Sequence, residues 1–102
     1  MTSMFHTLES IIVDRKNNPQ PGSYTNHLFD TGRNKIAQKV GEEATEVIVA
    51  ALGQTRSEQT SEIADLIYHL LVLMADLDIP MAEIEAELHK RHNSNGTFVE
   101  AD

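Results

Sequence analysis

The chain has 102 residues and no cysteine, and its sixteen acidic side chains outnumber its eight basic ones, giving a formal net charge of −8 at pH 7. This length suits a single domain, residues 1–102, whose small core a partner subunit would help to cover. The acidic balance and the lack of any lysine or arginine run argue against nucleic-acid binding as the main activity. Without cysteine, disulfides and thiolate metal ligands are excluded.

Neither an export signal nor a membrane span is expected from the sequence. His6 and Glu9 interrupt the apolar residues near the start, so the basic start and unbroken apolar run of a signal peptide are missing. No purely apolar run is longer than that of residues 70–75, which is far shorter than the ~20 residues needed to span a bilayer. We therefore expect a cytoplasmic protein with no membrane partner.

Two regions precede the most informative part of the chain. Residues 3–17 are predicted to form a helix, because apolar side chains recur there at helical spacing and a proline follows. Residues 19–31 are turn formers and polar residues without a period, which predicts a loop. The length of this loop makes it either a substrate loop or a plain connector anchored by Tyr24, Leu28 and Phe29.

A second helix is predicted over residues 33–52, and its charged side chains gather on one flank. Its apolar stripe consists of Ile36, Val40, Ala44, Val47, Ile48 and Ala51. At roughly 100° per residue, five charged residues lie beside this stripe, progressively further round one side: Glu43, Lys39, Glu46, Lys35 and Glu42. Glu42 and Glu46 are four residues apart and repel each other, which costs energy unless a cation lies nearby.

A third helix is predicted over residues 56–77, starting with a capping box formed by Thr55 and Glu58. Residues 66–74 are apolar on nearly all sides of this helix, which predicts that it is central and continues into a subunit interface. One edge of the helix carries its polar residues, namely Glu62, Asp65, His69 and Asp76.

The last predicted helix covers residues 80–92, with Met81, Ile84 and Leu88 facing inward. Residues 93–102 are expected to form a mobile tail. Apolar and polar residues nowhere alternate over five positions between turns, so no strand is predicted. The sequence therefore predicts an all-α protein with four helices in a bundle-like arrangement.

The two long helices each carry a pair of acidic residues three positions apart, Glu43 with Glu46 and Glu62 with Asp65. A short connection makes these helices antiparallel, with axes about 8–10 Å apart, so the four carboxylates can converge. Four carboxylates in one partly buried place cannot all stay ionised unless a cation compensates them. Because oxygen ligands select hard cations, we expect Mg²⁺, with Mn²⁺ as the second choice.

Such a metal site favours a phosphate substrate. Magnesium keeps water-filled positions where phosphate oxygens commonly bind. Lys35 and Lys39, with Arg33 nearby, would then face the same phosphates. The chain has no cysteine, and no serine lies in a recognisable nucleophile elbow, so attack of a metal-held water on phosphorus is the simplest mechanism.

These residues also carry a family resemblance. Glu42-Glu43-x-x-Glu46 followed by Glu62-x-x-Asp65 matches the EExxE…ExxD signature of the all-α nucleoside triphosphate pyrophosphatases of the MazG type. Within that superfamily, the chain most resembles the phosphoribosyl-ATP pyrophosphatase family over residues 5–92. The further matching segments are Ser23-Tyr24-Thr25, Lys35-Ile36-x-x-Lys39-Val40-Gly41-Glu42-Glu43, Asp65-Leu66-x-Tyr68-His69-Leu70-Leu71-Val72-Leu73 and Lys90-Arg91-His92.

The resemblance implies Mg²⁺-dependent hydrolysis of 1-(5-phosphoribosyl)-ATP to 1-(5-phosphoribosyl)-AMP and pyrophosphate, the second step of histidine biosynthesis. It also implies a dimer or a larger homo-oligomer. Carried over to this chain, the metal ligands are Glu43, Glu46, Glu62 and Asp65. We expect Glu42 to act with Glu43 and Glu46 in catalysis by orienting or deprotonating the water, and the substrate to be bound by Lys35, Lys39, Arg33 and Tyr24.

Other functions remain open on the sequence alone. A house-cleaning pyrophosphatase for ordinary or damaged nucleoside triphosphates would share the metal site, and a non-catalytic helical dimerisation module would carry the acids only on its surface. His69 is expected to be a half-buried histidine hydrogen-bonded within the bundle. A di-iron site would instead need Glu-x-x-His pairs, which are missing.

Overall fold

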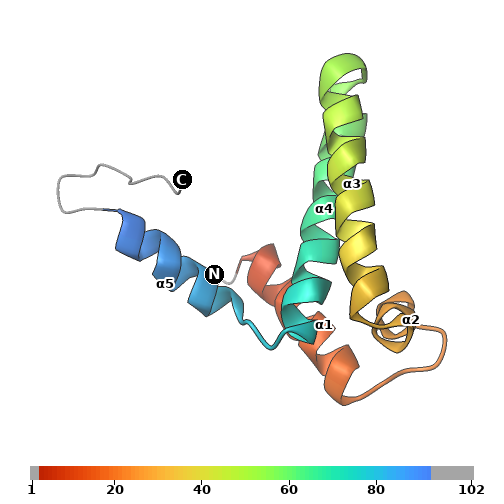
Figure 1. Ribbon diagram of the computed structural model, residues 1–102, viewed down its shortest axis with the longest axis vertical. Coiled ribbons are helices and arrows are strands. Elements are labelled where there is room, and N and C mark those ends of the chain that lie inside the picture. Colours follow the sequence, from red (N-terminus) through yellow and green to blue (C-terminus); the bar gives the residue numbers. More distant parts are fainter. Residues whose placement is uncertain (1–2, 93–102) are drawn as a thin grey trace.

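The computed structural model describes residues 3–92, and this part of the chain forms five helices. They are α1 (Met4–Asn17), α2 (Tyr24–Thr31), α3 (Arg33–Gly53), α4 (Arg56–Asp76) and α5 (Met81–Arg91) (Figure 1). The all-α prediction is confirmed, and the predicted helices at 3–17, 33–52, 56–77 and 80–92 agree with α1, α3, α4 and α5 to within a residue or two. The predicted mobile tail at 93–102 lies outside the described residues.

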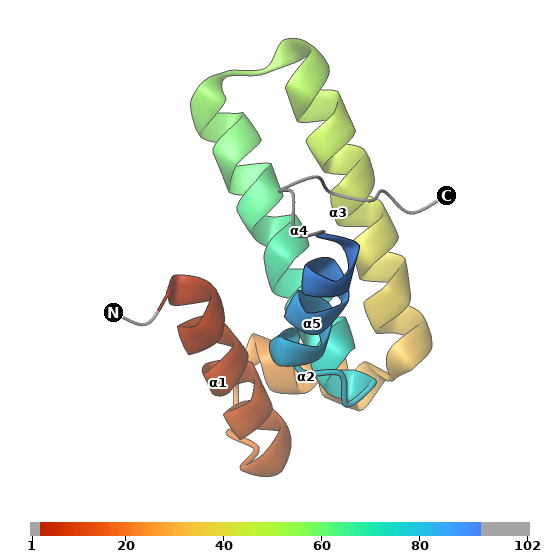
Figure 2. The same ribbon diagram turned by 90° about the vertical axis from the view of Figure 1, so that its left-hand side faces the viewer.

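Helices α3 and α4 form a long antiparallel hairpin, which Figures 1 and 2 show from two sides. The turn is short because Thr55 caps α4 at once: its hydroxyl accepts from the backbone N–H of Glu58, and the Glu58 carboxylate accepts from the backbone N–H of Thr55. The predicted capping box is thereby confirmed.

Within the described residues, none of the helices is both long and apolar enough to cross a bilayer.

The core lies at the base of the hairpin, where α1 and α2 pack against it. It consists of Ile12, Leu28, Ile36, Leu71, Val72 and Ala75, so α1, α2, α3 and α4 all contribute. Because α4 contacts α1 and α2 as well as α3, the prediction that this helix is central is confirmed. The turn end of the hairpin lies beyond this core and leaves much of its apolar surface exposed.

Helix α2 was missed in the sequence, which predicted a loop over residues 19–31. Ser23 caps the helix by accepting from the backbone N–H of Asn26, and Gly32 follows its end at φ 93°. Thr25 and Asn26 point inward although they are polar, because Asn26 bridges the backbones of Gln20 and Arg15. Polar residues on the buried face hide the helical period on which the prediction relied.

The orientation predicted for α5 is confirmed for Met81, which packs against the core, and was wrong for the other two apolar residues. Ile84 and Leu88 were expected to face inward, yet both are exposed and the helix has no buried residue. After the turn at Pro80, α5 points away from the hairpin (Figure 1), so its apolar side beyond Met81 has no helix to pack on within residues 3–92. Its first turn is held by Glu9 of α1, whose carboxylate accepts from the backbone N–H of Met81 at 2.5 Å.

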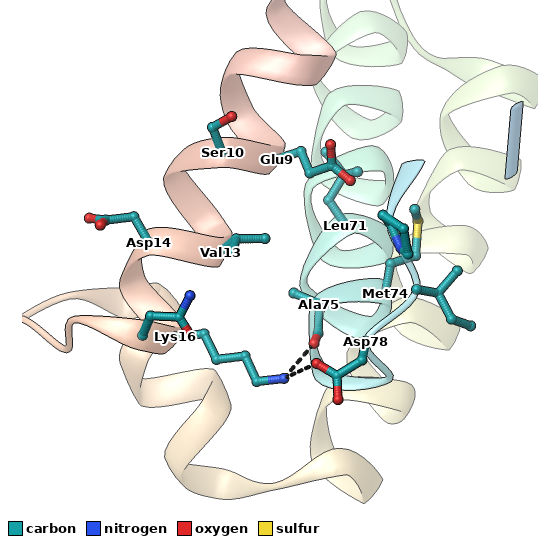
Figure 3. Close-up of a pocket in the computed structure, with 12 residues that line it drawn as sticks. Glu9, Ser10, Val13, Asp14, Lys16, Leu71, Met74, Ala75 and Asp78 are labelled. Atoms are coloured by element: carbon teal, nitrogen blue, oxygen red, sulfur yellow. Dashed lines mark hydrogen bonds and ion pairs between the residues drawn. The ribbon is translucent and has the colours of Figure 1, made fainter. Parts of the chain in front are cut away.

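Lys16 fixes the carboxyl end of α4 to α1, and this contact gives a first prediction. Its ammonium group donates to the carbonyl oxygen of Ala75 at 2.7 Å and to the Asp78 carboxylate at 2.8 Å (Figure 3). We expect Lys16→Met to lower the free energy of unfolding by about 1–2 kcal/mol, because the Ala75 carbonyl loses its charged donor at a helix end. Urea unfolding measures the change. A loss no larger than that of the exposed control Lys90→Met would contradict the prediction.

Candidate metal centre

Three of the four predicted metal-binding acids meet between α3 and α4. One carboxylate oxygen of each of Glu43, Glu62 and Asp65 lies within 4.8 Å of the other two. In an octahedral magnesium site, opposite oxygens are separated by twice the ~2.1 Å metal–oxygen distance, about 4.2 Å. Small rotations of these side chains would therefore allow all three carboxylates to bind one ion.

The hydrogen bonding of these acids is incomplete in a way that fits a cation. Glu43 is buried, and Glu62 is half-buried. One carboxylate oxygen of each, Oε2, is buried without a hydrogen-bond partner among the described residues. A buried carboxylate oxygen without a donor is costly, and a metal ion would satisfy both oxygens at once.

The carboxyl groups also make one another harder to ionise. Burial raises the pKa of Glu43, and the neighbouring Glu46 raises it further by hydrogen bonding and by its charge. The pKa of Glu62 is raised by the same causes in the same order. Glu46 is thus close to both carboxyl groups, although it is not one of the three that could bind one ion together. Negative charge is concentrated at this point more than its surroundings can compensate.

Lys39 is the cation nearest to the acids on α3. Its ammonium group lies 3.5 Å from Oε1 of Glu42 and 3.7 Å from Oε1 of Glu43. Partial burial lowers the pKa of Lys39, but Tyr24, Glu42 and Glu43 together outweigh that effect and raise it. The pKa of Glu42 is lowered, chiefly by the hydrogen bond from Gln38 and then by Lys39. Lys39 therefore stays charged near neutral pH and lies at the edge of the carboxylate cluster.

The other two predicted phosphate-binding cations lie nearer the start of α3 than Lys39 does. Lys35 is exposed, one helical turn before Lys39, and its charge contributes to the lowered pKa of Glu42. Arg33 forms an ion pair with Asp76 at 2.7 Å and donates to the backbone carbonyl of Asp76. Ten residues separate Arg33 from Glu43, which is about 15 Å of helix. Arg33 thus ties the start of α3 to the end of α4 rather than joining the cluster.

His69 is buried, and both of its ring nitrogens are hydrogen-bonded. Nδ1 donates to the backbone carbonyl of Asp65 at 2.7 Å, and Nε2 lies 3.2 Å from the hydroxyl of Tyr24. Because a carbonyl can only accept, Nδ1 carries the proton in the neutral ring, and Nε2 accepts from Tyr24. The prediction of a hydrogen-bonded histidine is confirmed, and neither nitrogen is free to bind a metal.

One contact at the site was not predicted from the sequence. The hydroxyls of Thr25 and Tyr68 form a short hydrogen bond that ties α2 to α4 beside His69. The ring of Tyr68 is stacked with that of Tyr24, with centroids 6.2 Å apart, and meets His69 edge-on. Thr25 and Tyr68 occur in the matching segments Ser23-Tyr24-Thr25 and Tyr68-His69, respectively. A signal was therefore present, but the loop prediction for residues 19–31 concealed the pairing.

Two cavities lie near the base of the hairpin, and they differ in their relation to the acids. A cavity of about 640 Å³ has Tyr24 in its wall and is otherwise lined by Pro19, Gln20, Pro21, Gly22, Ser23, Asn26, His27 and Asp30. Another, of about 610 Å³, lies between α1 and the end of α4 (Figure 3), and its lining includes none of the clustered acids. The Tyr24 cavity is connected to the cluster through the bond between Tyr24 and His69.

Comparison with known proteins identifies the family of the chain. The chain matches the family described as "Phosphoribosyl-ATP pyrophosphohydrolase" over residues 5–92. It is 50% identical over 94 residues to a "Phosphoribosyl-ATP pyrophosphatase" of Listeria monocytogenes, which covers 92% of this chain and 90% of the relative. It is 48% identical over 88 residues to a protein of the same name from Streptococcus thermophilus, covering 86% of this chain and 85% of the relative. A relative of that name from Clostridium acetobutylicum is 52% identical over 85 residues, covering 83% of this chain and 77% of the relative. The chain belongs to the phosphoribosyl-ATP pyrophosphohydrolase family.

Proposed function

We propose that this chain hydrolyses 1-(5-phosphoribosyl)-ATP to 1-(5-phosphoribosyl)-AMP and pyrophosphate, the second step of histidine biosynthesis. The proposal depends on one observation: the carboxylates of Glu43, Glu62 and Asp65 lie close together in a chain of this family. Water adds its oxygen to the α-phosphorus, the anhydride bond to the β-phosphate breaks, and pyrophosphate leaves. A cytoplasmic location, expected from the sequence, is part of the same proposal.

The residues that would hold Mg²⁺, or Mn²⁺ in its place, are Glu43, Glu46, Glu62 and Asp65. Support for Glu43, Glu62 and Asp65 comes from their meeting in the cluster, and for Glu46 from its effect in raising the pKa values of Glu43 and Glu62. When bound, the metal supplies charge neutralisation for the phosphates and a water that deprotonates more easily. All four ligands are oxygens, as hard divalent cations prefer.

The remaining roles are assigned from charge and position. Glu42 is exposed beside the cluster and has a lowered pKa, so its carboxylate is available to orient the attacking water or accept its proton. Lys39 and Lys35 follow one flank of α3 and would bind phosphate oxygens. Tyr24 would contact the substrate from the cavity side. Arg33 would take part only after releasing Asp76.

Turnover of several nucleotides tests the proposed substrate directly. We expect kcat/KM for 1-(5-phosphoribosyl)-ATP to exceed the values for ATP, dCTP and dUTP by about 100-fold or more, because binding groups matched to the second ribose phosphate are left unpaired by the others. Pyrophosphate release with Mg²⁺ present is the measurement. Equal turnover of all four would indicate a house-cleaning pyrophosphatase. Absence of turnover by folded protein with bound Mg²⁺ would contradict the enzymatic proposal.

A homodimer or larger homo-oligomer is the second part of the proposal. Ile48 and Leu52 lie four residues apart on α3 and are 60% and 84% exposed, and Ile63 and Leu70 on α4 are 46% and 39% exposed. Apolar stripes of this kind on both helices of a hairpin are typical of a surface that packs against another subunit. The partner that fits this surface in size and chemistry is a second copy of the hairpin, because two apolar stripes exclude water from each other.

Charge placed in that surface should weaken the association. We expect Ile48→Glu to raise the dissociation constant of the oligomer roughly 100-fold, because an ionised carboxylate would lose its water on contact. Sedimentation velocity across a concentration series measures the change. Leu88→Glu, at an exposed apolar position of α5, is the matched control and should leave the association unchanged. A wild-type protein that stays monomeric at all concentrations would contradict the assembly.

A further inference from the structure

The hydrogen bond between His69 and Tyr24 joins α4 to the wall of the Tyr24 cavity. His69 is 5% exposed and comes from the middle of α4, four residues after Asp65. Its Nδ1 is fixed by the backbone carbonyl of Asp65, so Nε2 is left as an acceptor that points to the Tyr24 hydroxyl. The ring therefore links the backbone of one cluster residue to a side chain in the wall of a cavity.

Tyr24 itself is held mainly through its hydroxyl. The residue is 49% exposed, and it is the first residue of α2, next to the Ser23 cap. Its ring lies beside those of Tyr68 and His69, with centroid distances of 6.2 and 6.0 Å, and the residue also lines the cavity of about 640 Å³. While its proton is donated to His69, the hydroxyl oxygen can only accept, so it is suited to an ammonium or a bound water rather than to a phosphate oxygen.

The charge interaction with Lys39 supports this direction. Tyr24 is among the groups that raise the pKa of Lys39, together with Glu42 and Glu43, so the tyrosine lies close enough to the lysine to affect its charge. A tyrosine oriented by His69 would limit where Lys39 can point and where the substrate can enter. Loss of that orientation should affect substrate binding, because neither residue is among the clustered acids.

We propose that His69 is a positioning residue. By bonding the Tyr24 hydroxyl, it fixes the position of this cavity wall relative to the carboxylate cluster. The inference rests on the proposed function for its kinetic consequence but not for the contact itself. His69 acts through Tyr24 and touches neither the metal nor the substrate. The second tie between α2 and α4, the bond of Thr25 to Tyr68, keeps the helix in place when the first is removed.

Two substitutions of His69 separate its two hydrogen bonds. Asparagine reproduces the donor at Nδ1 but not the acceptor at Nε2, and glutamine places an amide oxygen near the Nε2 position, where it can accept from Tyr24. We expect Tyr24→Phe and His69→Asn each to raise KM for 1-(5-phosphoribosyl)-ATP about tenfold with little change in kcat, and the double variant to be no worse than either single one. His69→Gln should restore KM to within roughly threefold of wild type.

Measurements without substrate test the hydrogen bond between His69 and Tyr24 separately from the proposed activity. In the metal-free protein, ¹⁵N NMR of the imidazole should report the Nδ1–H form of His69, and Tyr24→Phe should shift the Nε2 resonance. Calorimetric titration with Mg²⁺ should give the same affinity for wild type and Tyr24→Phe. If the wild type fails to turn over the substrate, the proposed function is wrong, whereas the NMR result still decides the contact.

Three outcomes would overturn the positioning role. They are an Nε2–H form of His69, KM effects of Tyr24→Phe and His69→Asn that multiply in the double variant, and a fall in Mg²⁺ affinity in Tyr24→Phe. If His69→Asn does not fold, Tyr24→Phe at its half-exposed position carries the same kinetic and NMR comparisons. A merely structural histidine would lower the melting temperature of His69→Asn without changing KM, which also counts against the role.

Discussion

Replacing Glu43 by glutamine is expected to lower turnover by roughly 10³-fold or more, because a buried metal-binding oxygen would be exchanged for a weaker neutral ligand. Glutamine keeps the shape of the side chain, so the fold should survive. In the absence of metal the variant should be more stable than wild type, since burial and Glu46 both disfavour the ionised Glu43. Pyrophosphate release and thermal unfolding measure the two effects.

The controls for Glu43 follow from the same cluster. Asp65→Asn should reduce turnover and Mg²⁺ affinity in the same way, because Asp65 contributes an oxygen to the same group of three. Glu83→Gln on α5 changes an exposed carboxylate and should alter neither. If Glu43→Gln and Asp65→Asn both bind Mg²⁺ as tightly as wild type, the carboxylates are surface charges, and the chain functions as a helical dimerisation module.

The convergence of the acids could be predicted because it depends only on helical period and a short connection. Residues three apart lie on one side of a helix, and consecutive helices joined by a tight turn must run side by side. Those two facts bring Glu43 to Glu62 and Asp65. They do not determine the axial register between the helices. Thus the sequence could not indicate that Arg33 would reach Asp76, nor that Glu46 would lie just outside the group of three.

Helices α2 and α5 show where sequence reasoning failed, for opposite physical reasons. In α2, the buried polar residues are hydrogen-bonded to groups outside the helix: Thr25 bonds Tyr68, and Asn26 bonds two backbone groups. An apolar period cannot reveal a face built from such bonds. In α5, the period was present, but Ile84 and Leu88 stay exposed because α5 points away from the other helices that the structure describes. Periodicity identifies a helix, whereas the partner of its apolar face depends on the tertiary arrangement.

Magnesium should stabilise the folded protein strongly, and this effect should grow with pH. At a Mg²⁺ concentration 100 times its dissociation constant, the free energy of unfolding increases by about 2.7 kcal/mol. For a domain of this size, that corresponds to a rise in melting temperature of roughly 10 °C or more. Protons and Mg²⁺ compete for the same carboxylates, so the rise should be larger at pH 8 than at pH 5. Scanning calorimetry with Mg²⁺ and with chelator measures it.

The metal-free protein should show the opposite pH dependence, which makes the test specific. The pKa values of Glu43 and Glu62 are raised in the folded state above the ordinary value of 4.5, so the folded state binds more protons than the unfolded state. The stability that they contribute is fully present below pH 4.5 and is lost as the pH rises through the raised pKa values. Glu42 and Asp78 have lowered pKa values, so their contribution is lost only as the pH falls.

The difference between wild type and Glu43→Gln isolates the cluster from those other acids. Both proteins share Glu42 and Asp78, so subtracting their stability curves removes the acid-side loss and leaves the term from Glu43. That difference should be small below pH 4.5 and should increase in favour of the variant at higher pH, where the wild-type carboxylate ionises. Adding Mg²⁺ should reverse its sign, because only the wild type regains a full set of ligands. A difference that is independent of both pH and Mg²⁺ would show that Glu43 is neither strained by burial nor a metal ligand.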